Sequence, residues 1–365
     1  LLIAVNQGGK RPGAGCAYLE PWHLDFEDFL NLRRNTGDER LRCHDMNTAA
    51  WIPDEFMRRV KNEKEWYFFD PKEMKYEEGK TLHDYFGQEF DDKYNELCKA
   101  AEEGLVKNFR KTPAKDLWKK MLKVLFETSH PWNTFKDPCN IRYTNQHQGT
   151  VHSSNLCTEI TLHTKSSKYE KGEKTEIGET AVCNLGSINL LNHLREHVNE
   201  KGKSAFDLNW TKLAETTQTA LRMLDNVIDL NFYPTREAEK SNLKHRPVGL
   251  GMMGLHDILH KMNIMIDSDE AVSFSDKLFE SYSKNAIFSS SKLAAERGSY
   301  NTYSGSLWDQ GEFPIDSYNH LMEYRDKPKS SETISEWEEV RASVKKYGMR
   351  NSNVMAIAPT ATIAN

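Results

Sequence analysis

The hydrophobic positions of this chain follow two patterns. In several stretches apolar residues recur every three or four positions, which places them on one face of a helix. Other stretches are short apolar runs bounded by Gly, Pro and polar residues, which is typical of strands. The predicted helices cover 25–34, 88–103, 114–128, 207–230 and 269–297, and the predicted strands cover 17–19, 153–160, 181–190 and 246–251. Because strand-like runs alternate with helices, the pattern predicts an α/β fold.

Three further patterns add elements to this picture. A polar run over 165–179, rich in Lys, Ser, Glu and Gly, predicts a surface loop or hairpin tip. Thr333 and Glu336 have the spacing of a capping box, which predicts a helix that opens there and ends at Gly348. The apolar run before Pro359 predicts one more strand.

Length and charge narrow the class of protein. At 365 residues the chain is long enough for one large or two ordinary domains. Its net charge of −5 argues against general nucleic-acid binding, which needs a basic excess. No apolar run approaches the roughly 20 residues of a membrane span and no signal peptide is recognisable, so we expect a cytoplasmic protein without a membrane partner. Apolar runs at both ends favour an interior piece of a longer polypeptide.

The cysteines show no pattern of a structural metal site. They are Cys16, Cys43, Cys98, Cys139, Cys157 and Cys183. None belongs to a CxxC pair or has zinc-finger spacing, so we expect no metal ligands among them. In the cytoplasm they would be mostly reduced, and a disulfide would be catalytic rather than structural.

The stretch 153–160 combines an amide, a thiol and a carboxylate. If it is extended, Asn155, Cys157 and Glu159 project to one side, with neighbours roughly 6.6 Å apart along the backbone. These three groups could surround one small molecule. The alternative is a structural strand with a buried cysteine, since cysteine often behaves as a small hydrophobe. A thiol hydrolase is disfavoured, because in a strand His152 would point to the opposite face from Cys157.

Three other stretches have candidate chemistry with a plain structural alternative. The glycine-rich loop at 7–15 carries Lys10 and Arg11, which could hold an anion or a base; otherwise it is an exposed turn. Cys183 is a redox candidate if it lies beside another reactive thiol and a core residue if it does not. The sequence PTAT at 359–362 could cradle a phosphate with hydroxyl and backbone N–H groups, or simply end a strand.

Seven motifs, taken together and in order, carry a resemblance to one family. They are QGGKRPGA at 7–14, EPWHL at 20–24, SNLCTEI at 154–160, AVCNL at 181–185, HRPVG at 245–249, YGMRNS at 347–352 and PTAT at 359–362. Each is weak alone, but their order is highly specific. The chain resembles the large, catalytic (alpha) subunit of ribonucleotide reductase. The residues of its motifs are most similar to those of the aerobic class.

The resemblance implies a fold and an extent. The family fold is a ten-stranded α/β barrel built of two five-stranded halves, with a central finger loop that carries a radical cysteine. Residues 1–365 would be the central part of this catalytic barrel domain, incomplete at both ends. The ATP-sensing region on the N-terminal side and the C-terminal end would lie outside the sequence.

The resemblance also implies a role for each site residue. Cys157 would be the transient thiyl radical, Glu159 the general base for the 3′ hydroxyl, and Asn155 the residue that binds the ribose hydroxyls. Cys183 would be one of two thiols that reduce the substrate and end as a disulfide; its partner lies upstream of this sequence. The implied substrate-binding residues are Ser154, Asn155, Leu156, Cys157, Thr158, Glu159, Pro359, Thr360, Ala361, Thr362 and Ile363, and the implied specificity loop comprises Gln7, Gly8, Gly9, Lys10, Arg11 and Gly13. Ile363 departs from relatives that carry a hydroxyl at this position.

The implied reaction converts ribonucleoside diphosphates to 2′-deoxyribonucleoside diphosphates. The family implies no cofactor bound directly by this chain. A separate metal-containing small subunit would supply the radical, thioredoxin or glutaredoxin would restore the thiols, nucleoside triphosphates would act as effectors, and large subunits would form a homodimer. Two alternatives stay open: an adenosylcobalamin-dependent reductase, and an inactive or split nucleotide-binding barrel that needs other chains.

Overall fold

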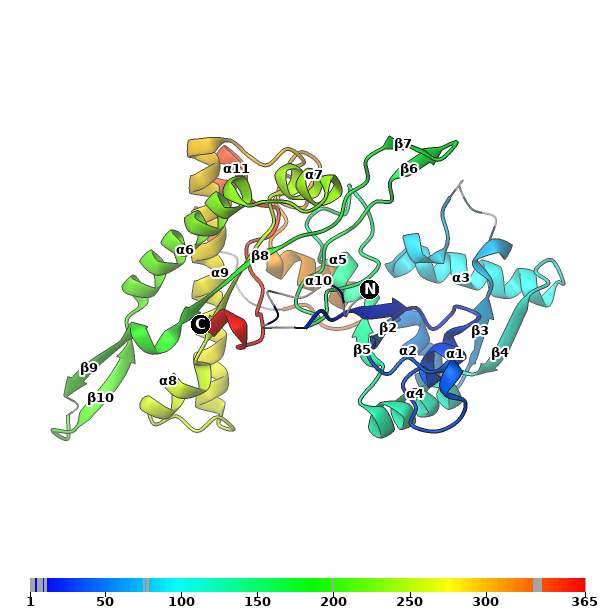
Figure 1. The fold of residues 1–365 in the computed structure, drawn as a ribbon. Coiled ribbons are helices and arrows are strands. Elements are labelled where there is room, and N and C mark those ends of the chain that lie inside the picture. Colours follow the sequence, from blue (N-terminus) through cyan, green and yellow to red (C-terminus); the bar gives the residue numbers. More distant parts are fainter. Residues whose placement is uncertain are drawn as a thin grey trace. The chain divides into compact units, whose positions relative to one another are not determined.

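The computed structural model describes residues 4, 9, 12–74, 76, 79–198, 200–330 and 337–364. The chain divides into two compact units (Figure 1). Unit 1 comprises Leu1–His163 and Pro314–Ser330, and unit 2 comprises Thr164–Phe313 and Ser331–Asn365. In the described ranges, no helix is both long and apolar enough to cross a membrane.

Unit 1 is built on a small parallel sheet. Its strands are β1 (Cys16–Leu19), β2 (Asn47–Ile52), β3 (Glu65–Phe69), β4 (Phe109–Pro113) and β5 (Trp132–Phe135). Its helices are α1 (Phe26–Asn31), α2 (Asp54–Lys61), α3 (Gly87–Glu102), α4 (Ala114–Thr128), α5 (Lys136–Ile141) and α10 (Pro314–Tyr324), with the short 3₁₀ helices η2 (Glu39–Leu41), η3 (Pro71–Glu73) and η4 (Leu82–Asp84). β1, β2 and β5 pair in parallel, while β3 and β4 form an antiparallel pair.

Aromatic side chains form the core of unit 1. The Trp66 ring stacks on Tyr94 at 4.4 Å between centroids and meets the edge of Phe56 at 4.9 Å. All three side chains are fully buried. Such offset and edge-to-face pairs add to the free energy of burial, and they belong to the same buried cluster as Ala50 and Ile52 of β2.

One buried ion pair and one buried carboxylate hold α5 to neighbouring segments of unit 1. Lys136 is fully buried, and its Nζ donates to Glu20 Oε1 at 2.8 Å; Glu20 lies in the EPWHL motif. Asp137 accepts from Asp54 N at 2.6 Å and from Gly87 N at 2.7 Å. These are the first residues of α2 and α3, so one carboxylate satisfies an orphan N–H at two helix starts. Burial raises the pKa of Asp137 to about 6, although the two backbone N–H groups oppose that rise.

Unit 2 contains the second group of elements. Its strands are β6 (Lys168–Glu170), β7 (Glu173–Glu176), β8 (Asn184–Asn189), β9 (Leu194–Val198), β10 (Ser204–Leu208) and β11 (Val248–Met253). Its helices are α6 (Trp210–Leu230), α7 (Arg236–His245), α8 (Leu255–Lys261), α9 (Asp269–Arg297) and α11 (Glu338–Tyr347), with the 3₁₀ helices η5 (Leu190–His193) and η7 (Thr362–Ala364). β8 and β11 pair in parallel, and β6–β7 and β9–β10 are antiparallel hairpins.

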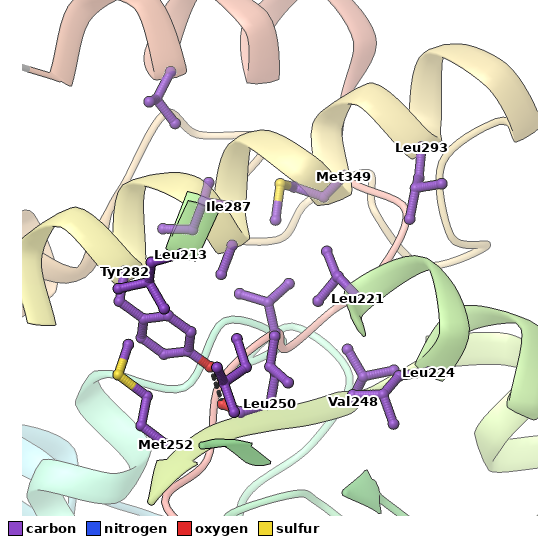
Figure 2. Close-up of a cluster of buried hydrophobic side chains, with 14 of the residues drawn as sticks. Leu213, Leu221, Leu224, Val248, Leu250, Met252, Tyr282, Ile287, Leu293 and Met349 are labelled. Atoms are coloured by element: carbon purple, nitrogen blue, oxygen red, sulfur yellow. Dashed lines mark hydrogen bonds between the residues drawn. The ribbon is translucent and has the colours of Figure 1, made fainter. Parts of the chain in front are cut away.

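An apolar core lies between the strands of unit 2 and its two long helices, α6 and α9. Figure 2 shows this cluster, with Tyr282 of α9 reaching across to β11. The buried Tyr282 hydroxyl donates to the carbonyl oxygen of Leu250. Leu250 O also accepts from Ala356 N at 3.1 Å, so the segment before Pro359 runs beside β11. One carbonyl therefore joins a helix and two extended segments.

Most predicted elements are present, but the strand predicted before Pro359 is wrong: that described segment makes only an isolated bridge to β11, at Met355. α4 and α9 begin and end where the hydrophobic periodicity predicts, and β6 and β7 confirm the surface hairpin at 165–179. α6 begins at Trp210 rather than 207, because Asp207 and Leu208 belong to β10. The predicted capping residues Thr333 and Glu336 lie outside the described residues, but α11 does end before Gly348. The mixed α/β class is confirmed; across the described ranges the strands form one three-stranded and four two-stranded sheets and no closed barrel.

Candidate active site

The stretch 153–160 is a turn, so the prediction of an extended strand is wrong. Thr158 N donates to Asn155 O at 3.3 Å, and Thr158 has a φ of 66°. Side chains close the segment on itself: Ser154 Oγ donates to Ile160 O at 2.5 Å, and Ile160 N donates to Asn155 Oδ1 at 3.1 Å. Short polar side chains that bond nearby backbone groups compete with strand pairing, which explains the turn.

The turn still gathers the three predicted catalytic side chains in one short segment. Cys157 lies exposed at its tip beside Thr158. Glu159 is half-buried, and its Oε2 atom is buried with no hydrogen-bond partner among the described residues. An unpaired buried carboxylate oxygen is costly and calls for an explanation. Glu159 Oε2 is therefore an acceptor that a proton of a bound molecule could use.

The approach to this turn is tethered to η4. Thr150 Oγ1 donates to Asp84 O at 2.8 Å, and His152 Nε2 lies 3.1 Å from Asp84 Oδ1. Burial raises the pKa of Asp84, but hydrogen bonds from the His152 side chain and the Thr81 backbone outweigh it, so the net pKa is lowered. His152 is therefore held by a carboxylate at the approach to the turn.

A pocket of about 420 Å³ lies beside the tethered segment. It is lined by Cys16, Tyr18, His83, Asp84, His152 and Ser153. Burial raises the pKa of the Cys16 thiol to about 11, so this thiol stays protonated at neutral pH. Tyr18 Oη donates to Asn155 O at 2.7 Å, which links the pocket to the turn.

Cys183 lies in unit 2, directly before β8, and is half-buried. Its Sγ packs against Gly249 of the HRPVG motif on the paired strand β11. A Cβ at Gly249 would lie 3.1 Å from Cys183 Sγ and 2.5 Å from Leu185 Cδ2. Glycine is therefore needed at 249 because any larger residue would displace the thiol or its neighbour.

The motifs HRPVG and YGMRNS meet at one buried carboxylate, Asp225 of α6. Arg246 donates to Asp225 Oδ1 from Nε at 3.0 Å and from Nη2 at 2.8 Å. Asn351 Nδ2 donates to the same oxygen at 3.1 Å and to Arg246 O at 3.1 Å. Arg297 Nη1 donates to Asp225 Oδ2 at 2.8 Å. This network joins the two motifs and aligns β11 with the segment that follows Asn351.

His245 of the HRPVG motif contacts a second buried carboxylate, that of Glu179. Its Nε2 lies 2.6 Å from Glu179 Oε2, and Lys244 Nζ donates to Glu179 Oε1 at 2.6 Å. Burial raises the pKa of Glu179, but the hydrogen bonds and charges of these two neighbours lower it to a net value of about 2. The base of the β6–β7 hairpin is thereby fixed to α7.

The predicted phosphate turn follows the segment beside β11. Residues 359–362 are exposed, Ala361 N donates to Pro359 O at 2.8 Å, and η7 begins at Thr362. η7 lies against β8, the strand that follows Cys183. Unit 2 therefore brings the predicted redox thiol and the predicted phosphate turn to the same strand. Ile363 is only partly exposed.

The predicted specificity loop is only partly described. Gln7, Gly8, Lys10 and Arg11 lie outside the described residues. Gly9 is exposed with a φ of +72°, and Gly13 is half-buried three residues before β1. Reasoning from the sequence missed Tyr18, Asp84 and Asp225. Tyr18 and Asn155 are 137 positions apart, so no local spacing could have indicated their bond.

Comparison with known proteins finds the same family that the seven motifs indicate. Residues 2–365 match the family model described as "Ribonucleotide reductase, barrel domain". The chain is 52% identical over its full length to the ribonucleoside-diphosphate reductase subunit alpha of Chlamydia pneumoniae and covers 33% of that protein. It is 37% identical to the subunit alpha of Helicobacter pylori strain J99 and 37% identical to the large subunit of Danio rerio, covering 49% and 41% of them. In each case 99% of the chain is aligned. The chain thus spans about a third to a half of these relatives.

Proposed function

This chain belongs to the ribonucleotide reductase family, and on that premise we propose that the complete protein reduces ribonucleoside diphosphates to 2′-deoxyribonucleoside diphosphates. The relatives are named for this reaction. The observation that best supports the proposal is the turn at 155–158, where an exposed thiol lies two residues from a carboxylate with an unpaired oxygen. The proposal includes the ten-stranded α/β barrel of the family as the fold of the complete domain.

Each catalytic side chain has a proposed step. Cys157, as a thiyl radical, takes the hydrogen atom from C3′ of the ribose and later returns it. Glu159 accepts the proton of the 3′ hydroxyl through its unpaired oxygen. Asn155 uses its amide to orient the ribose hydroxyls, since an amide donates and accepts without titrating.

Cys183 and a second thiol from another part of the complete protein supply the electrons. The 2′ hydroxyl leaves as water, a hydrogen replaces it, and the two thiols become a disulfide, so two electrons pass to the ribose. The exposed turn at 359–363 is the proposed seat of the substrate phosphates, with Ser154, Leu156 and Thr158 as further substrate contacts. Backbone N–H groups can serve there even where Ile363 lacks a hydroxyl.

The proposal also names partners. The relatives are called alpha or large subunits, which implies a smaller partner. We propose that this partner holds the metal that generates the radical, that thioredoxin or glutaredoxin restores the thiols, and that large subunits pair as a homodimer. Nucleoside triphosphates are the proposed effectors, and the loop around Gly9 and Gly13 is the proposed specificity loop.

The test uses the complete protein with its small subunit. Cys157→Ser should abolish turnover while diphosphate binding, measured by calorimetry, stays within a few fold. Glu159→Gln should lower kcat by about 10² to 10⁴-fold, the usual range for a general base. The matched controls are Cys43→Ser and Glu103→Gln, which lie outside the site motifs. Both should keep normal turnover.

Four results would contradict parts of the proposal. Turnover by Cys157→Ser would rule out the radical role of this thiol. Equal loss of binding and kcat in Glu159→Gln would assign that residue a structural role. Diphosphate binding without reduction by the wild-type protein would favour a nucleotide-binding barrel, and turnover that needs adenosylcobalamin instead of the small subunit would replace the proposed radical source.

A further inference from the structure

A hydroxyl from a distant part of the chain holds the candidate catalytic turn. Tyr18 Oη donates to Asn155 O at 2.7 Å across 137 residues of sequence. The same carbonyl accepts the Thr158 N–H at 3.3 Å, the bond that closes the turn. The bonds that Ser154 and Ile160 make are internal to the segment. Tyr18 instead ties the turn to the parallel sheet of unit 1.

Tyr18 is well placed to be a rigid donor. It lies on β1 opposite Ala49 of β2, and its ring meets the edge of the buried Trp51 ring at 5.8 Å and 81°. Burial, together with the nearby Cys16 thiol, raises the pKa of Tyr18. The hydroxyl is therefore protonated at physiological pH and can only be a donor to a carbonyl oxygen. The sheet and the ring contact fix where that donor lies.

We propose that Tyr18 is a positioning residue for Asn155, Cys157 and Glu159. The Asn155 carbonyl belongs to the first peptide plane of the turn, so holding its oxygen sets the direction in which the turn leaves. The positions of the thiol and the carboxylate depend on that direction, because Cys157 and Glu159 follow within four residues. A misplacement of about 1 Å at a reacting group is enough to slow a reaction strongly. This inference rests on the proposed function, because that function makes Cys157 and Glu159 the reacting groups. The hydrogen bond from Tyr18 to Asn155 O does not depend on the proposed function.

The test compares Tyr18→Phe with Tyr76→Phe in the complete protein. Tyr18→Phe removes the hydroxyl and keeps the ring against Trp51. Tyr76→Phe is the matched control, because Tyr76 Oη also donates to a backbone carbonyl of unit 1, that of Lys93 at 3.2 Å, away from the turn. Hydrogen exchange of the peptide covering 153–161 is measured by mass spectrometry, together with kcat, KM and the melting temperature.

In Tyr18→Phe we expect amide exchange in this peptide to rise about fivefold, which corresponds to about 1 kcal/mol, the usual net value of one hydrogen bond. We expect kcat to fall by about the same factor or more, with KM for the diphosphate within twofold and the melting temperature within a few degrees. Tyr76→Phe should leave both exchange at 153–161 and kcat unchanged. A merely structural Tyr18 would instead change the melting temperature and leave exchange and kcat alone.

The outcomes separate this inference from the proposed function. Unchanged exchange in the turn of Tyr18→Phe would overturn the inference, whatever the activity. Faster exchange with an unchanged kcat would also overturn it, because the turn would then move without affecting the reaction. A wild-type protein that reduces no diphosphate would refute the proposed function, while faster exchange in Tyr18→Phe would still show that Tyr18 holds the turn.

Discussion

Replacing Asp225 with Asn tests whether the two motifs HRPVG and YGMRNS act by meeting at this carboxylate. Asp225 is fully buried and accepts hydrogen bonds from Arg246, Arg297 and Asn351. Asn has nearly the same size, so it leaves no cavity. It removes the negative charge, however, and places an NH₂ group where an acceptor is needed.

The expected loss of unfolding free energy depends on the partners that Arg246 and Arg297 keep when Asp225 is replaced. Breaking a buried ion pair by removing one partner costs about 3–5 kcal/mol, because the other charge is left buried and uncompensated. Arg246 is only 6% exposed but retains Asp229 at 2.8 Å, and Arg297 is 30% exposed and keeps access to water. We therefore expect the lower end of that range, a loss of about 3 kcal/mol in the free energy of unfolding of unit 2.

The assay is urea unfolding of the complete polypeptide, with hydrogen exchange of α6 and α9 peptides to report on unit 2. Asp229→Asn is the matched control: it also removes a carboxylate from Arg246, but Asp229 is 49% exposed. Exposed pairs contribute about 0–1 kcal/mol, so this variant should lose no more than that. If Asp225→Asn unfolds within about 1 kcal/mol of wild type, the two motifs do not depend on this carboxylate.

Three further predictions concern single residues. Gly249→Ala should destabilise unit 2 by about 1–3 kcal/mol in urea unfolding and change the alkylation rate of Cys183, since the new Cβ would lie too close to its neighbours. In the control Gly186→Ala the new Cβ would have no neighbour nearer than 3.5 Å, so stability and the alkylation rate should both stay unchanged. The pKa of Glu179 in the folded protein, about 2, lies below its usual 4.5. Its carboxylate therefore stabilises the fold above pH 4.5, and this stabilisation is lost as the pH falls towards 2. Acid titration followed by circular dichroism should show that the Glu179→Gln variant lacks this loss of stability. Asp137→Asn should lower the free energy of unfolding by about 2 kcal/mol in urea, because its NH₂ group would face one of the two N–H groups that the carboxylate accepts, and an unchanged value would contradict its role at both helix starts.

The elements that the sequence predicts well are those whose signal is local. α4 and α9 carry apolar residues at helical spacing and end at residues suited to a helix end, Ser129 with a left-handed backbone and Gly298. Their bounds need no information from distant residues. The β6–β7 hairpin is similar, since its polar composition alone excludes a buried position.

The prediction for 153–160 failed because two local signals conflict. Alternation of apolar and polar residues favours a strand, whereas Ser154 and Asn155 can bond backbone groups within the segment. In the structure the second signal prevails, and Thr158 adopts a positive φ. The predicted combination of a thiol and a carboxylate in one short segment does not depend on the strand, because two residues that are two positions apart stay neighbours in a turn as well.

The motifs that identify the family divide into two kinds. SNLCTEI carries groups that can react: Cys157 is exposed at the turn, and Glu159 has a buried oxygen with no hydrogen-bond partner among the described residues. HRPVG and YGMRNS instead carry groups that are buried and bonded to one another through Asp225. They contribute to the proposed site indirectly, because they align β11, whose Gly249 leaves room for the Cys183 thiol, with the segment that leads to the proposed phosphate turn. A residue such as Asp225, which belongs to no motif, can therefore matter as much as the motif residues, because it is the acceptor that makes two separate motifs one structure.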